Sequence, residues 1–324
     1  MHDTQLEQEI SDFKYYSVEE KPSLLLAKGM LSVNEYGLLY SLGKSYRSTG
    51  LVLDLGSFCG ASAFCLGMGI MDSNVALKFN RPLHCFDRFI NDNQNTNNYI
   101  NRFFYSHLGV GKRELTSSNF EVENFRNIFD FQTSYVSQYI QVHAGSLLEL
   151  DLRLFDSNIE IINVDLGKSE AVNNFIIKNF HPKIVPQGYI FQQDIAIPDH
   201  WYLLYSMLLL KNYLTLKFYK KPSGWLFQVK ESIPRRQINK CIQSLNAIDE
   251  KSILEAYQQC LSWIPEELHP TINHCFAFCL IEKCGISKKF GDINTIFDYF
   301  SVAINSQSAK RIKLLCRRKN YLAK

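Results

Sequence analysis

Short apolar runs, each closed by a polar residue or a glycine, recur along the first 230 residues. Seven runs have the length of a β-strand, and several are apolar nearly throughout, as strands covered on both faces are. They occupy residues 51–56, 83–87, 139–145, 159–165, 188–194, 214–220 and 224–230. Helical patterns lie between most of them, so the sequence predicts an α/β domain with a largely parallel sheet.

The last two runs differ because only "PSG", residues 221–223, separates them. Three residues are too few for a crossover helix and are typical of a tight turn, so this pair is predicted to form an antiparallel hairpin. The fold predicted as a whole is Rossmann-like, a mostly parallel seven-stranded sheet with an antiparallel last strand.

Helical patterns are predicted on both sides of this domain. Residues 32–35, "SVNE", have the capping-box pattern of a hydroxyl followed three residues later by a carboxylate, and predict a helix to about Tyr46. After the last strand the apolar spacing is helical only. We therefore expect an N-terminal helical segment at 1–48, an α/β domain at 49–230 and a helical appendage at 231–324.

One connection inside the domain is long, because 51 residues, 88–138, separate the second and third predicted strands. It begins with the amide-rich "NDNQNTNN", which predicts a mobile segment, and continues with the aromatic "RFFYSHLGVGKREL". Long connections in compact domains are usually functional or disordered. We expect a lid-like insertion that folds over a site.

The net charge of +3 is unevenly placed. Residues 231–324 hold 14 Lys/Arg and 9 Asp/Glu, and the last fifteen residues, "KRIKLLCRRKNYLAK", carry seven basic groups and no acid. Such a tail can contact nucleic acid or an acidic partner. A solvated helix end is the favoured interpretation, since no aromatic-and-basic RNA-binding motif is visible.

Cysteine usage and hydropathy bear on the compartment. The nine cysteines are scattered without a C-x-x-C motif, as free thiols of a reducing cytosol are. The N-terminus is acidic and lacks the apolar core of a signal peptide. The longest uncharged stretch, residues 55–71, is too short and too glycine-rich for a membrane span. We expect a cytoplasmic protein without a membrane partner, and a homo-oligomer is compatible with the sequence.

The candidate ligand site follows the first strand, in "LDLGSFCGASA". Asp54 lies at the end of the strand, and Gly56 and Gly60 then lead into a helical pattern. Parallel sheets bind ligands beyond the carboxyl ends of their strands, and glycines let the backbone approach a ligand closely. Phe58 and Ala61 stand where a dinucleotide fingerprint needs glycine, so that class of site is excluded.

This acid-x-Gly-x-x-x-Gly pattern resembles the signature of class I S-adenosylmethionine-dependent methyltransferases. More narrowly, four motifs in order resemble the macrocin O-methyltransferase family: "LDLGSFCGASA", "LHCFDRF", "INVDLGKS" and "GYIFQQD". The resemblance covers about residues 31–230, and the insertion and the appendage lie outside it. It implies S-adenosylmethionine as cofactor and a hydroxylated small molecule as acceptor.

The resemblance also implies which residues hold the cofactor. An acid such as Asp54 would help to hold the ammonium group, directly or through water, and Asp87 would accept hydrogen bonds from the ribose hydroxyls. The candidate set is Asp54, Gly56, Ser57, Gly60, Ser62, Asp87, Gly145 and Ser146, the last two beside the adenine. The alternative is that the glycines serve only a tight turn and Asp87 caps a helix.

Methyl transfer also needs a group that takes the proton of the acceptor. Asp165 and Asp194 end the fourth and fifth predicted strands, and together with Gln193 they offer the oxygen ligands that Mg²⁺ prefers. The related family uses a metal there to orient and acidify a sugar hydroxyl, and often has two adjacent carboxylates where this chain has Gln193 and Asp194. The alternative is that these aspartates cap the following helices.

The catalytic candidates are Asp165 and His200, although a lone histidine before an apolar helix is more often structural. Lys168 is expected to pair with a carboxylate or to touch the substrate. A zinc site is disfavoured for the cluster near the C-terminus, because its spacing puts the thiols in a helical core. That cluster comprises His274, Cys275, Cys279 and Cys284.

The sequence therefore predicts an S-adenosylmethionine-dependent methyltransferase, which O-methylates a glycosyl or other hydroxylated small molecule. Two alternatives stay open. One is a nucleic-acid-binding or RNA-methylating protein that uses the basic C-terminal tail. The other is a methyltransferase-like fold without catalysis.

Overall fold

A computed structural model describes most of the chain. The described residues are 13–90, 98–100, 102, 124–152, 156–220, 224–286, 290–302 and 306–319. They form two compact units, residues 1–165 and 166–324. The boundaries expected at residues 48 and 230, between the N-terminal segment, the α/β domain and the helical appendage, stay predictions.

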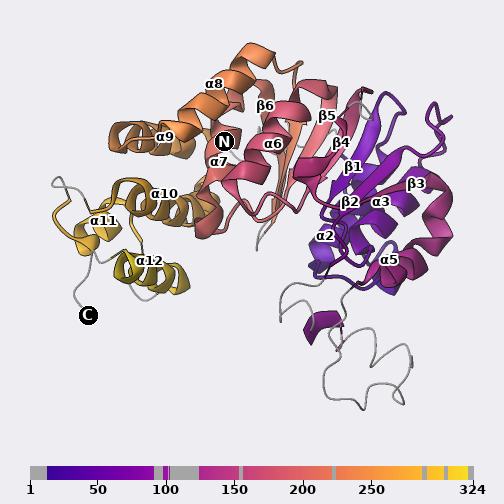
Figure 1. The fold of residues 1–324 in the computed structure, drawn as a ribbon, viewed down its shortest axis with the longest axis horizontal. Helices are drawn as coiled ribbons and strands as arrows, with labels where there is room; N and C mark the ends of the chain where they lie inside the picture. The colour runs from indigo at the N-terminus through magenta and orange to yellow at the C-terminus, as the bar shows by residue number, and fades with distance from the viewer. Residues whose placement is uncertain are drawn as a thin grey trace. The chain divides into compact units, whose positions relative to one another are not determined.

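The first unit carries four strands and the helices between them (Figure 1). Its elements are η1 (Pro22–Leu26), α2 (Val33–Lys44), β1 (Leu51–Leu55), α3 (Ala61–Asp72), β2 (Leu83–Asp87), α5 (Arg126–Thr133), η3 (Ser134–Tyr139), β3 (Ile140–Ala144), η4 (Leu147–Glu149) and β4 (Ile159–Val164). Every residue of β1 and β4 is buried, as expected for central strands.

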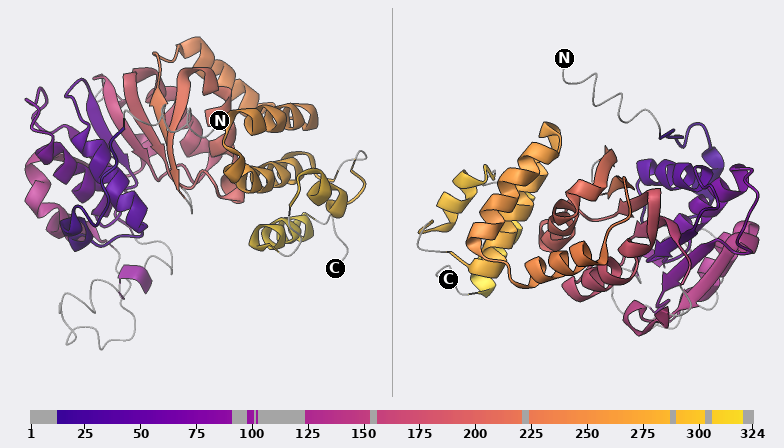
Figure 2. Two further views of the ribbon diagram at one scale, coloured as in Figure 1. Left: turned by 180° about the vertical axis from the view of Figure 1, so that it is seen from behind. Right: turned by 90° about the horizontal axis from the view of Figure 1, so that it is seen from above.

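The second unit continues with three strands and then contains only helices among its described residues (Figure 2). Its elements are α6 (Glu170–Asn179), η6 (His181–Lys183), β5 (Ile184–Gln192), η7 (Pro198–His200), α7 (Trp201–Leu209), η8 (Lys211–Tyr213), β6 (Leu214–Lys220), β7 (Gly224–Val229), α8 (Arg235–Asn246), α9 (Glu250–Trp263), η9 (Glu266–Leu268), α10 (His269–Cys284), α11 (Ile293–Tyr299) and α12 (Gln307–Arg318).

The seven strands form one sheet in the order β3-β2-β1-β4-β5-β7-β6. β1 pairs in parallel with β2 and β4, β2 pairs in parallel with β3, and β7 runs antiparallel to β5 and β6. The predicted Rossmann-like sheet and its closing hairpin are confirmed. The chain passes from β1 to β2 on one side and later returns to β4 on the other. The crevice for a ligand is therefore expected beyond the carboxyl ends of β1 and β4.

The predicted capping box is present at the start of α2. The Ser32 hydroxyl accepts the Glu35 N–H at 3.4 Å, and the Glu35 carboxylate accepts the Ser32 N–H at 2.7 Å, which completes the capping box of α2.

The long connection is described only in part. The amide run at 91–98, apart from Asn98, and nearly all of the aromatic segment at 102–115 lie outside the described residues. The described end of the connection forms α5 and η3, and an isolated bridge pairs Ile90 with Asn124. A lid-like role for this insertion stays a prediction.

The basic tail begins as an amphipathic helix, α12. Ala309, Ile312 and Cys316 are buried, whereas Lys310, Arg311 and the basic residues 317–319 are exposed. Burial of one face accounts for the helix, and residues 320–324 lie outside the described part. Across the described residues, no helix combines the length and the apolar character that a membrane crossing requires.

Glu160 of β4 holds the segment that leads into β1. Its carboxylate is 1% exposed and accepts the backbone N–H groups of Arg47 and Thr49 at 2.6 and 2.7 Å, the Thr49 hydroxyl at 2.7 Å and the Arg47 Nε at 3.2 Å. Burying N–H groups without a partner costs free energy.

Glu160→Ala is therefore expected to lower the free energy of unfolding by about 3 kcal/mol, because four donors lose their acceptor. Chemical denaturation measures this loss. The matched control is Glu149→Ala, at an exposed glutamate of the same unit, which should change stability by less than about 0.5 kcal/mol. Equal effects of the two substitutions would contradict this assignment.

Candidate functional site

The loop between β1 and α3 has an unusual backbone. Gly56, Phe58 and Gly60 all have positive φ, at 98°, 43° and 99°. Such angles cost little for glycine but are strained for a bulky residue such as Phe58. Strained backbone that the surrounding structure holds in place is concentrated at binding sites. The loop thus has a strained backbone at the carboxyl ends of the strands of the first unit, where a ligand is expected.

Asp87, at the end of β2, holds this loop. Its Oδ2 accepts the Phe58 N–H at 2.9 Å and its Oδ1 accepts the Phe89 N–H at 2.8 Å. Burial raises the pKa of Asp87, and the backbone N–H groups of Phe89, Phe58 and Arg88 act against that rise. Three backbone donors leave part of the acceptor capacity of this carboxylate for a further donor, such as a ribose hydroxyl.

Asp54 is fully buried, and the candidates Ser57 and Ser62 are buried as well. Its carboxylate accepts the Ser62 hydroxyl at 2.8 Å and the Asn163 amide at 2.7 Å. Burial raises the pKa of Asp54 against the effect of side-chain hydrogen bonds from Asn163, Ser62 and Ser57. The buried Ser57 hydroxyl donates to the Asp54 carbonyl at 3.0 Å. These contacts join the end of β1 to α3 and β4, and a direct contact of Asp54 with a ligand stays a prediction.

Both glycines of the loop face protein atoms. A Cβ at Gly56 would lie 3.0 Å from the carbonyl carbon of Asp165, and one at Gly60 would lie 2.8 Å from Cγ2 of Thr133 and 3.1 Å from Phe129. The glycines are therefore required for the close approach of β4 and α5. A larger side chain at either position would therefore displace protein atoms before it met any ligand.

Gln132 of α5 is a residue that sequence reasoning missed. Its Nε2 donates to the carbonyl of Cys59 in the glycine loop at 2.6 Å and to the carbonyl of Lys28 at 2.9 Å. Its Oε1 accepts the Lys28 N–H at 2.5 Å. One side chain thus ties the loop to two segments that are far away in sequence, and no local motif signals such a residue.

Gly145 and Ser146 follow β3 at the same edge. Gly145 has a φ of 131°, and a Cβ there would meet nothing within 4 Å. Its N–H donates to the Asp87 carbonyl at 2.9 Å, which places this turn beside the end of β2. A role of Gly145 and Ser146 beside an adenine stays a prediction.

In the second unit, polar candidates follow β5. Asp194 has a positive φ of 56°, and its carboxylate lies 3.4 Å from Lys168 Nζ. His200 ends the 3₁₀ turn η7 directly before α7, and its Nδ1 is buried without a hydrogen-bond partner in the described part of the chain. Gln193 is buried. Lys168 thus pairs with a carboxylate, one of the two roles expected for it.

Burial lowers the pKa of His200. The Asp194 carboxylate raises it and the Lys168 ammonium lowers it, and the balance lies below the ordinary value. The imidazole is therefore neutral at pH 7 and can accept a proton.

Asp165 is the last residue of the first unit, and its N–H donates to the Leu55 carbonyl at 2.8 Å. Its side chain is partly exposed. Within the described ranges, no group of three or more His, Cys, Asp and Glu residues could hold a metal ion. The predicted magnesium ligands Asp165, Gln193 and Asp194 stay predictions.

The cysteine-rich helix α10 packs its thiols inside. Cys275 and Cys279 are buried and line a small space together with Trp201 and Leu204 of α7. Cys284 is partly exposed at the end of the helix. All nine cysteines of the chain are unpaired.

No protein-family model and no curated protein matches the sequence. Among solved structures, the chain is similar to the O-methyltransferase NovP, with 13% identity over 71% of this chain and 100% of that one, and a TM-score of 0.44. It is also similar to CalS11, a TDP-rhamnose 3'-O-methyltransferase of calicheamicin biosynthesis (13% identity, 69% and 91% covered, TM-score 0.41). A third is an O-methyltransferase from Bacillus cereus in complex with SAH (12% identity, 71% and 100% covered, TM-score 0.40). Each is a likeness of fold alone.

Gly60→Ala is expected to lower the free energy of unfolding by about 1–2 kcal/mol through its left-handed φ, and further through contact with Thr133. Thr133→Ser removes the Cγ2 methyl group but keeps the hydroxyl. The double variant should therefore be more stable than the sum of the single changes predicts, as measured by denaturation in a double-mutant cycle.

Gly145→Ala is the matched control, because it has the positive φ but open space around its Cβ. Thr133→Ser should give it no rescue. Strictly additive effects of Gly60→Ala and Thr133→Ser would show that the contact with Thr133 is unimportant.

The pKa of His200 can be followed by its imidazole resonances in NMR. We expect a value below the ordinary 6.5, so that the ring is charged only in acid. Asp194→Asn should lower this pKa further, and Lys168→Met should raise it, because the two charges act in opposite directions. A pKa at or above 6.5 in the native protein would contradict the buried setting of this ring.

Proposed function

We propose that the protein is an S-adenosylmethionine-dependent methyltransferase that methylates a hydroxyl of a small molecule, in the first place a glycosyl acceptor. The observation that carries this proposal is the strained β1–α3 loop, with Asp87 pinning its Phe58 N–H. A thin backbone loop and a carboxylate at neighbouring strand ends suit a ligand that has a ribose and no phosphate.

The proposal assigns the cofactor to the first unit. Asp87 would accept hydrogen bonds from the ribose hydroxyls, and Gly145 and Ser146 would border the adenine. Gly56, Ser57 and Gly60 would shape the loop, with Asp54 and Ser62 holding it to the strand and α3. When bound, the cofactor supplies an electrophilic sulfonium methyl group.

His200 is the proposed proton acceptor. Its Nδ1 is buried, so Nε2 is the nitrogen that can meet an acceptor hydroxyl, and its lowered pKa keeps it neutral at pH 7. Asp194 favours the imidazolium that forms when the proton arrives. A general base of this kind contributes about 10²–10⁴-fold to the rate.

A magnesium ion bound by Asp165, Gln193 and Asp194 is the alternative way to activate the hydroxyl, with Asp165 then the second catalytic residue. The ion pair with Lys168 already supplies a positive charge to Asp194 and favours the metal-free form. We place the enzyme in the cytoplasm, on account of its nine unpaired thiols.

Calorimetry is expected to show that the native protein binds S-adenosylmethionine or its demethylated product. Asp87→Ala should weaken this binding by roughly 1.5–3 kcal/mol, because it removes a charged hydrogen-bond acceptor. Asp156→Ala, at an exposed acid of the same unit, is the matched control and should bind normally. Failure of the native protein to bind either compound would end the proposal.

Turnover then separates the two ways of activating the acceptor. Once screening of hydroxylated small molecules has found a substrate, His200→Gln should reduce kcat by about 10²–10⁴-fold with cofactor affinity unchanged. The rate of the native protein should fall at acid pH, where His200 becomes protonated, because its pKa is lowered. Addition of a chelator should leave this rate unchanged. Loss of activity with chelator, together with inactive Asp165→Asn and Asp194→Asn variants, would assign the step to magnesium instead.

A further inference from the structure

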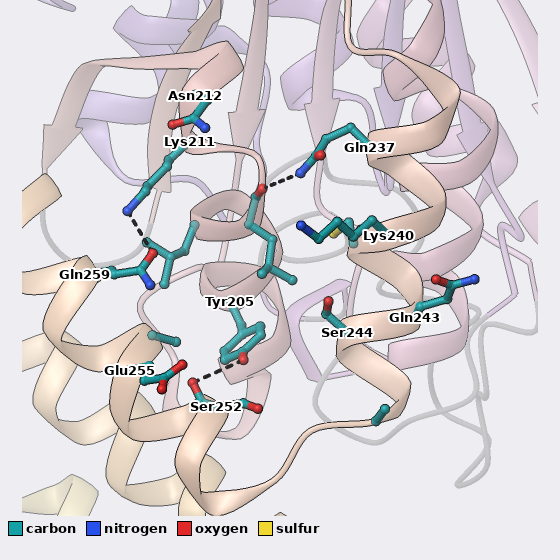
Figure 3. Close-up of a pocket in the computed structure, with 15 residues that line it drawn as sticks. Tyr205, Lys211, Asn212, Gln237, Lys240, Gln243, Ser244, Ser252, Glu255 and Gln259 are labelled. Carbon is teal, nitrogen blue, oxygen red and sulfur yellow. Dashed lines mark hydrogen bonds between the residues drawn. The ribbon is translucent and has the colours of Figure 1, made fainter.

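A polar cleft of about 580 Å³ lies within the second unit, among α7, η8, α8 and α9 (Figure 3). Its volume is in the range of small-molecule sites. Its polar lining consists of Lys211, Asn212, Gln237, Lys240, Gln243, Ser244, Ser252, Glu255 and Gln259. None of these residues belongs to the proposed methyl-transfer site.

The cleft holds positive charge that its own residues do not neutralise. Glu255 is the one acid in its lining, and that carboxylate faces Lys251 at 3.8 Å, outside the lining. Lys211 donates to the neutral Gln259 amide at 2.9 Å. Lys240 points from α8 toward the cleft and has no hydrogen bond or ion pair among the described residues (Figure 3). An anion would complete this arrangement.

The remaining lining suits a ligand rich in hydroxyl groups. Four amide side chains and the Ser244 hydroxyl offer donors and acceptors, whereas the Ser252 hydroxyl donates to Asp249 at 2.5 Å and can only accept. The Gln237 amide is held by the Leu209 carbonyl at 3.1 Å, which leaves its own oxygen to accept. Leu208, Leu209 and Ala256 add apolar surface against which a ring can lie.

We propose that this cleft is a second ligand site, which binds a phosphorylated, hydroxyl-rich small molecule of the sugar-phosphate class. Lys240 and Lys211 supply the charge for the phosphate, and the amides of α8 and α9 read the hydroxyls. The site goes beyond the proposed methyl transfer and does not depend on it.

Calorimetry of the full chain at low ionic strength tests the site with three probes: glucose 6-phosphate, inorganic phosphate and glucose. Glucose 6-phosphate should bind at least tenfold more tightly than glucose. Lys240→Ala should weaken its binding at least tenfold, and Lys240→Gln should do the same with the side-chain length largely kept. Gln243→Leu should weaken the binding of glucose 6-phosphate but leave the binding of inorganic phosphate unchanged.

Lys310→Ala on α12 is the matched control, because it makes the same change in net charge at an exposed lysine outside the cleft. It should leave the affinity unchanged, and all variants should keep the native unfolding temperature. Equal binding of glucose and glucose 6-phosphate, equal loss in Lys310→Ala and Lys240→Ala, or no binding of either phosphate would overturn the proposal. Cofactor titrations of Lys240→Ala should match the native protein, which keeps failure of this site distinct from failure of methyl transfer.

Discussion

The hydrogen bond from the Phe58 N–H to the Asp87 carboxylate holds the β1–α3 loop in place. Any ligand site at the carboxyl ends of these strands depends on that loop. Phe58 has a positive φ, which a phenylalanine adopts only when something compensates for the strain. A partly buried carboxylate that accepts a backbone N–H is strong enough to do so. The same carboxylate holds the Phe89 N–H, so the ends of β1 and β2 share one anchor.

A second carboxylate, that of Asp54, stabilises the same loop from its buried side. Asp54 binds Ser62 of α3 and Asn163 of β4, and thereby fixes how the helix leaves the sheet. Buried polar groups of this kind are costly when unpaired, so each partner requires the others. The loop is therefore held in two ways, by the Asp54 network beneath it and by the Asp87 carboxylate beside it. A loop fixed in this way lowers the entropy that a ligand must overcome on binding.

The fold was predictable from the sequence because its signals are local. The strands were marked by apolar runs, the hairpin by "PSG" and α2 by its capping box. β5 begins at Ile184, earlier than predicted, because Pro186 and Gln187 make its first part read as a loop. The orientation of Asp54 was not predictable, since a strand that is buried on both faces gives no alternation to follow. Gln132 and the cleft beside α8 depend on contacts between distant segments, which no local pattern records.

Gln132 makes part of the long connection necessary for the structure of the glycine loop. An insertion that merely decorates a surface can be shortened or exchanged at little cost. Here the end of the connection supplies Gln132 to the glycine loop and packs Phe129 and Thr133 against Gly60. A variant with a short turn in place of this connection would have to support the loop by other residues, so the connection cannot be cut back beyond α5 without loosening the loop.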